Sequence, residues 1–205
     1  MKIERLKSDS YTKAEHTLRV LVRARSKQEV IDNIVGKDRL TVCTDNEDRQ
    51  VVVATFDGFK FAHSITPSDG GFEVILGDEP PTLDFCIAQK IKEIEAYDTS
   101  PAVNSFTLAG VEMWLDKDTR VGLMNSIGIE KSAGRTLTNL WFRTTKYTLP
   151  VDLVVKILNE IELYALASYN VTHLHIAAVE KLTSRDEVEK YDYTSLYPTK
   201  LMFNL

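Results

Sequence analysis

Between residues 17 and 76, short runs in which hydrophobic and polar residues alternate follow one another at close spacing. This alternation is typical of β-strands that bury one face. Turn-forming stretches rich in Asp, Gly and Pro separate the runs, among them Asp57-Gly58, a dipeptide typical of a β-hairpin turn. The pattern predicts an antiparallel sheet with strands at 17–25, 39–44, 50–56, 59–65 and 72–76.

The spacing of apolar residues changes after Ser26, where positions 30, 31, 34 and 35 fit one face of a helix. Ser26 and Glu29 have the spacing of a capping box, and Gly36 is suited to end a helix. We expect one short helix at 27–35 to cover one face of the sheet. Residues 1–79 are therefore predicted to form a small α+β domain, rich in β-structure.

Pro80-Pro81 marks the clearest boundary in the chain, because two prolines stop a strand and fix an extended backbone. An amphipathic helix that connects two domains is predicted at 80–98, with Thr82 placed to cap it. Its narrow apolar stripe suits packing within the chain, which we expect, and also pairing with a second copy. The stripe consists of Leu83, Ile87, Ile91, Ile94 and Tyr97.

Residues 99–205 predict a second α+β domain, a hairpin followed by a long amphipathic helix. The hairpin has strands at 105–108 and 111–115 around a turn at Ala109-Gly110. The long helix begins near Pro150, and we expect Asn170-Val171-Thr172 to interrupt it, because Asn and β-branched residues weaken helices. Further elements are expected at 116–127 (helix), 138–142 and 146–149 (strands), 185–190 (helix capped by Ser184 and Glu187) and 199–204 (strand).

The chain has 205 residues, 43% hydrophobic and 27% charged, which suits one large or two small globular domains. A formal net charge of −5 argues against a protein that coats nucleic acid. No apolar run approaches the roughly 20 residues that span a membrane, and the N-terminus lacks the apolar core of a signal peptide. We expect synthesis in a cytoplasm, reduced thiols at Cys43 and Cys86, and neither nucleic acid nor membrane as a partner.

No combination of residues marks a catalytic centre. His173 and His175 lie two positions apart, so on a helix they cannot chelate one ion as an i, i+4 pair does. Asp45, Glu47 and Asp48 resemble part of a calcium loop, but its glycine and its closing glutamate are absent. The sequence also lacks a nucleophile elbow and a phosphate-binding loop. We predict no enzyme activity, no metal and no cofactor.

Aromatic residues gather in the second half of the chain. Two explanations stay open for them: packing in the core and loops, or a surface that binds a partner. We expect packing for most of them, and a binding surface is the alternative because interface cores are enriched in aromatic residues. The candidate binding residues are Trp114, Trp141, Tyr191, Tyr193 and Tyr197.

A more specific pattern lies at 105–120, where Phe106 and Gly110 form an F-x-x-x-G turn and Asp116 and Arg120 form a D-x-x-x-R segment. Asp116 and Arg120 are spaced to pair across one helical turn and to position the hairpin against the helix, a structural role. Further blocks follow in order, including Leu140-Trp141-Phe142, Glu162-Leu163-Tyr164-Ala165, Tyr169-Asn170-Val171-Thr172 and Tyr191-Asp192-Tyr193-Thr194.

Together these blocks, over residues 91–203, resemble a domain of unknown function found in tail and tail-fibre proteins of tailed bacteriophages. The resemblance implies a structural or assembly role and no catalytic residues. One hypothesis is a virion component, a tail, baseplate or fibre-adaptor protein that is made in the host cytoplasm and binds other tail or fibre proteins. A homo-oligomer is one form of this hypothesis.

The alternative hypothesis is a soluble tail-fibre assembly chaperone that is absent from the finished particle. A hydrolase acting on surface glycans is disfavoured, because no pair of carboxylates is marked by its surroundings. Of these hypotheses we expect the virion component.

Overall fold

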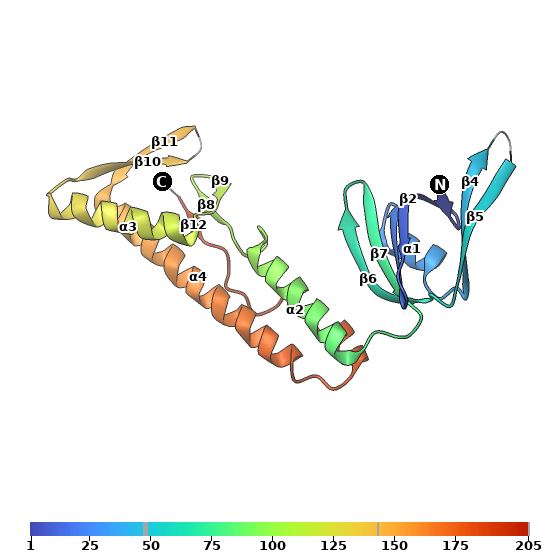
Figure 1. The fold of residues 1–205 in the computed structure, drawn as a ribbon. Helices are drawn as coiled ribbons and strands as arrows, with labels where there is room; N and C mark the ends of the chain where they lie inside the picture. Colours follow the sequence, from blue (N-terminus) through green and yellow to red (C-terminus); the bar gives the residue numbers. More distant parts are fainter. Residues whose placement is uncertain (47–48, 143, 205) are drawn as a thin grey trace. The chain divides into compact units, whose positions relative to one another are not determined.

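The computed structural model describes residues 1–46, 49–142 and 144–204 and shows a mixed α+β protein (Figure 1). The predicted fold class is therefore confirmed. The chain divides into two compact units, Met1–Cys86 and Ile87–Leu205. Most of the helix that we expected as a connector at 80–98 belongs to the second unit. Glu47 and Asp48, from the fragment that resembles a calcium loop, lie outside the described residues.

The first unit contains an antiparallel sheet that is larger than predicted, with seven strands among the described residues. Their order across the sheet is β5-β4-β1-β2-β3-β7-β6. The first two strands escaped prediction because β2 carries few apolar residues and buries the polar Ser8. The strands are β1 (Lys2–Ile3), β2 (Leu6–Lys13), β3 (Thr17–Arg23), β4 (Arg39–Asn46), β5 (Arg49–Asp57), β6 (Phe61–Ser68) and β7 (Gly71–Gly77).

The sheet must be strongly curved, because β5 and β6 are consecutive in the chain but occupy its two edges. Four residue steps from Asp57 to Phe61 reach at most about 14 Å. A flat sheet of this order would be about 29 Å wide. Tyr11 of β2 accordingly packs on Phe56 of β5, with ring centroids 5.4 Å apart. The hairpin predicted at Asp57-Gly58 is therefore wrong: Gly58 turns the chain toward the opposite edge.

The helix α1 (Lys27–Ile34) contributes to the core that this curved sheet encloses. Ser26 caps it, because its side chain accepts a hydrogen bond from the Glu29 backbone N–H at 3.1 Å. Two of its eight residues, Val30 and Ile34, are buried. The predicted arrangement, a helix that covers one face of a small sheet, does not fit, because strand residues supply most of the core. These are Ile3, Leu6, Leu18, Val20, Val22, Leu40, Val42, Phe56, Val74 and Leu76.

In the second unit the predicted hairpin is present, and three long helices accompany it. The turn at Ala109-Gly110 joins β8 to β9, and both turn residues have positive φ. A second hairpin, β10 with β11, forms a separate sheet, while β12 pairs in parallel with β8. The elements are α2 (Leu83–Thr99), β8 (Phe106–Leu108), β9 (Val111–Met113), α3 (Lys117–Ser132), β10 (Leu137–Phe142), β11 (Thr145–Pro150), α4 (Val151–Val179), α5 (Arg185–Lys190) and β12 (Met202–Phe203).

Helix α4 runs unbroken for 29 residues, so the predicted interruption at 170–172 is wrong. Thr172 is buried in the helix, and its hydroxyl lies 3.1 Å from the Ser168 carbonyl oxygen one turn earlier. The same hydroxyl lies 2.8 Å from Asp98 Oδ1 and 2.9 Å from the Tyr197 hydroxyl. These tertiary contacts outweigh the weak helix propensity of the segment.

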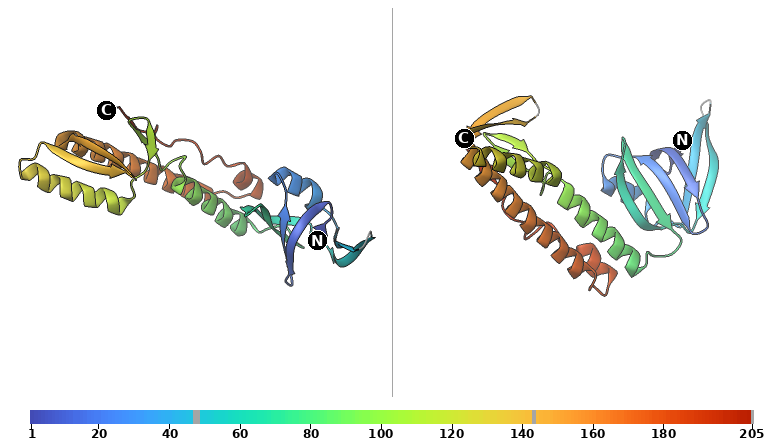
Figure 2. Two further views of the ribbon diagram at one scale, coloured as in Figure 1. Left: turned by 90° about the horizontal axis from the view of Figure 1, so that it is seen from above. Right: turned by 60° about the vertical axis from the view of Figure 1, so that its left-hand side comes forward.

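The C-terminal segment 191–201 runs along α2 and α4, which lie side by side in the views of Figures 1 and 2. Tyr97 of α2 packs edge-on against Tyr193 and Tyr197 of this segment. Ile94, one turn before Tyr97, is fully buried. Ile94 and Tyr97 of the α2 stripe thus pack within the chain, as expected for this part of the helix.

Replacing Gly110 by valine is expected to destabilise the second unit by about 1–2 kcal/mol, because φ at Gly110 is 78°, a conformation that β-branched residues avoid. A Cβ there would meet no atom within 4 Å, so the cost comes from the backbone alone. Gly110→Asn is the matched control, since Asn tolerates this conformation. Urea unfolding followed by tryptophan fluorescence reports on this unit, which holds both tryptophans. If the valine variant were as stable as the unaltered protein, the positive φ of Gly110 in this turn would be contradicted.

Candidate functional site

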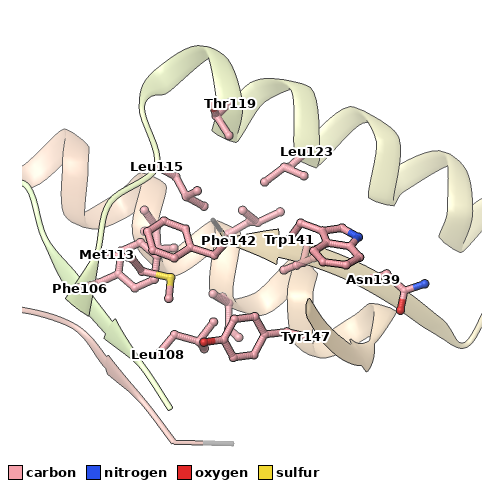
Figure 3. Close-up of a pocket in the computed structure, with 14 residues that line it drawn as sticks. Phe106, Leu108, Met113, Leu115, Thr119, Leu123, Asn139, Trp141, Phe142 and Tyr147 are labelled. Atoms are coloured by element: carbon pink, nitrogen blue, oxygen red, sulfur yellow. The ribbon is translucent and has the colours of Figure 1, made fainter. Parts of the chain in front are cut away.

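An apolar pocket of about 310 Å³ lies in the second unit, between the β10–β11 hairpin, the β8–β9 hairpin, α3 and α4 (Figure 3). The β8–β9 hairpin supplies Phe106, Leu108 and Met113. Helix α4 supplies Ile157, Leu158 and Ile161, which share one face because they lie three and four positions apart. The remaining lining residues are Leu115, Thr119, Leu123, Asn139, Leu140, Trp141, Phe142 and Tyr147.

Two hydrophobic clusters meet around this pocket. One is built on Phe106 and Ile161, and the other on Val154 and Leu158. Tyr147 and Leu115 pack against both clusters. The pocket walls are thus held by buried residues from several elements, which suits a preformed binding site.

The polar side-chain groups of the pocket are few, and two of them are hydrogen-bonded within the chain. The Thr119 hydroxyl donates to Asp116 Oδ2 at 2.9 Å, and the Thr148 hydroxyl donates to Asn139 Oδ1 at 2.8 Å. Among the lining residues that the structure describes, Tyr147 alone has a titratable side chain. The chemistry of the pocket therefore suits an apolar group that is bound by exclusion of water.

Trp141 is exposed to solvent and also lines this pocket. Its side chain is 66% exposed and also lines the cavity, so it lies at the rim (Figure 3). Trp114, by contrast, is half-buried: its ring packs on Phe106 and Tyr164, and the Arg120 guanidinium lies 5.3 Å from its centroid. Of the two tryptophans singled out in the sequence, the structure places Trp141 at a surface where it can meet a partner.

The three candidate tyrosines fasten the C-terminal segment to the helices. The Tyr191 hydroxyl lies 2.8 Å from Nδ1 of the buried His175, whose Nε2 lies 2.9 Å from the Ser195 carbonyl oxygen. A carbonyl oxygen only accepts, so Nε2 is the donor in the hydrogen bond to Ser195. Burial raises the pKa of Tyr191, and also those of Tyr193 and Tyr197. The three tyrosines thus make these contacts with other residues of the same chain.

The F-x-x-x-G and D-x-x-x-R residues have structural roles. Phe106 is a core residue, and Asp116 caps α3 by accepting from the Thr119 backbone N–H at 2.8 Å, a hydrogen bond that lowers the pKa of this carboxyl. The expected Asp116–Arg120 pair is wrong. Arg120 instead donates to Glu162 Oε2 of α4 at 2.7 Å and to the Leu115 carbonyl oxygen at 2.6 Å. The buried guanidinium thus joins α3 to α4.

The two neighbouring histidines of α4 diverge as expected for a helix. His175 is buried and hydrogen-bonded, whereas His173 is exposed and packs on Tyr169. Within the described residues, no group of three or more His, Cys, Asp or Glu side chains is placed to hold a metal ion. Over the same part of the chain, no helix combines the length and the apolar character that crossing a membrane requires.

Comparison of the chain with family models, with curated proteins and with solved structures finds no match. The resemblance to a phage-tail domain therefore stays a prediction. The pocket is not predicted by the sequence pattern. Its walls come from segments up to 55 residues apart, from Phe106 to Ile161, and each segment alone has the pattern of ordinary core residues. The aromatic block at Leu140-Trp141-Phe142 was the one signal that pointed to it.

Proposed function

We propose that the protein is a non-enzymatic component of a bacteriophage tail, an adaptor of the tail, baseplate or fibre that binds other tail proteins. The single observation that carries the binding role is the apolar pocket with Trp141 at its rim. The phage context rests on the ordered sequence blocks between residues 91 and 203. In this proposal the pocket receives apolar side chains of a partner protein.

A protein partner suits the pocket better than a small polar metabolite. Sites for small molecules usually carry several convergent polar groups that fix the orientation of the ligand. Here polar groups are few, and the Thr119 hydroxyl and Asn139 Oδ1 are already bonded within the chain. Protein interfaces instead concentrate binding energy in buried aromatic anchors next to apolar pockets. Trp141 is placed to become such an anchor once a partner covers it.

Trp141→Ala is expected to reduce incorporation of the protein into phage particles at least tenfold, because truncating an interface hot spot costs about 2 kcal/mol or more. Folding should be preserved, since the side chain is largely exposed. Leu137→Ala is the matched control, because Leu137 lies on the same strand at a similar exposure but does not line the pocket.

The measurement is complementation of a phage that lacks the gene, with plaque yield and particle content scored for each variant. Normal plaque yield and normal particle content of the Trp141 variant would contradict the pocket as the binding site. Equal loss of incorporation in the Trp141 and Leu137 variants would point to a general effect of the hairpin surface. That result would also contradict the pocket as the binding site.

A further inference from the structure

The solvent face of α4 is apolar where a helix of a monomeric protein is usually polar. Leu163, Leu166 and Leu174 are 67%, 56% and 56% exposed. Ala167 and Ala177 on the same face are exposed as well. We call Leu163, Leu166, Ala167, Asn170, Leu174 and Ala177 the α4 stripe.

The α4 stripe is a continuous surface on the side of the helix opposite its core face. Its members recur at steps of three and four residues, so they share one face. The core face carries Ile161, Ser168, His175 and other buried residues, which alternate along the helix with the members of the stripe. From Leu163 to Ala177 the stripe is about 21 Å long at 1.5 Å per residue. Apolar residues on both faces are typical of a helix that is covered on both sides.

We propose that the α4 stripe binds the α4 stripe of a second copy of this chain, in an antiparallel pair whose two-fold axis passes near Asn170. The stripe is self-complementary about this residue. In such a pair Leu166 of one copy lies at the level of Leu174 of the other, and Leu163 lies at the level of Ala177. The isologous contact that a two-fold axis requires is therefore available.

The charges at the ends of the stripe fit the same pairing. Glu160 lies on α4 before the stripe, and Lys181 lies in the turn that follows the end of α4 at Val179, so about an axis near Asn170 they come to a similar level in opposite copies. Glu160 has a contact of 3.9 Å with Lys156 in its own chain, which is at the long limit of an ion pair. Its carboxylate can therefore turn to a partner's lysine at little cost. Asn170 at the axis is the kind of polar residue that fixes register in paired helices.

The area of the stripe sets the expected strength of the pair. Covering the exposed parts of its leucines and alanines, with the neighbouring Tyr169, removes on the order of 400 Å² of apolar surface per copy. A standard stable interface buries about 800 Å² per partner. We therefore expect a reversible dimer in the micromolar concentration range. This pairing is independent of the proposed pocket, which lies on the other face of α4.

Sedimentation equilibrium across the micromolar range tests the pairing. The unaltered protein should show a monomer–dimer equilibrium, and Leu166→Glu should weaken it at least tenfold. Ile129→Glu is the control, since Ile129 is a similarly exposed apolar residue on α3 outside the stripe. A monomer at every concentration, a larger assembly, or equal behaviour of the two variants would overturn the proposal. Circular dichroism confirms that each variant is folded.

A charge exchange tests the antiparallel orientation. Glu160→Lys and Lys181→Glu should each weaken the dimer several-fold, because like charges then face each other. The double variant, which has the net charge of the unaltered protein, should restore the original affinity. If the losses of dimer affinity in the two single variants instead add up in the double variant, the antiparallel register is overturned even if a dimer forms.

Discussion

Replacing His175 by alanine is expected to lower the free energy of unfolding of the second unit by about 3 kcal/mol. The imidazole is 2% exposed and hydrogen-bonds both Tyr191 and the Ser195 carbonyl. It also stacks on Tyr197, with ring centroids 5.9 Å apart. Alanine leaves a cavity and leaves the Tyr191 hydroxyl and the Ser195 carbonyl without this partner, and each of these changes costs free energy.

The C-terminal segment should also become accessible, because His175 joins it to α4 at both nitrogens. Urea unfolding followed by tryptophan fluorescence measures the stability, and limited proteolysis between residues 191 and 201 measures the release. His173→Ala is the control, since this exposed neighbour should change stability by about 0.5 kcal/mol or less. Equal stability and equal cleavage in the two variants would show that the segment is held by other contacts.

Arg120→Ala is expected to destabilise the second unit by about 2–3 kcal/mol. The Arg120 side chain is 7% exposed, and its guanidinium bridges Glu162 of α4 to the Leu115 carbonyl just before α3, with the Trp114 ring beside it. Its loss removes two charge-assisted hydrogen bonds and leaves that carbonyl without this donor. The cost stays below that of a fully buried pair, because the Glu162 side chain is 48% exposed and water can solvate it.

Arg120→Lys separates charge from geometry in this prediction. Lysine keeps the positive charge, but it cannot make the two divergent hydrogen bonds of the guanidinium fork. We expect it to recover less than half of the loss. Unfolding in urea gives both values, and full recovery by lysine would mean that charge alone joins the two helices.

Local chemistry was predictable from the sequence. The capping box of Ser184 and Glu187 is present, with the Glu187 N–H donating to Ser184 Oγ at 3.3 Å. The turn at Ala109-Gly110 forms the predicted hairpin. Both signals work because every group that they need lies within four residues, so the chain can satisfy them before any tertiary contact forms.

Two of the failures depend on how whole elements pack against one another. Asp57-Gly58 has the local chemistry of a hairpin, yet the neighbour of β5 is β4 and the neighbour of β6 is β7. Arg120 lies one helical turn from Asp116, but its partner is Glu162, 42 residues away. Strand order and helix packing decide these outcomes, and neither is encoded in the spacing of nearby residues. The pocket depends on the same long-range packing.

Quantitative mass spectrometry of purified phage particles tests most directly our proposal that this protein is a structural component of a phage tail. We predict peptides of this chain at a fixed copy number relative to the portal or the major tail protein. Abundant chain in the infected-cell lysate together with its absence from particles would contradict a virion component and would favour the assembly chaperone.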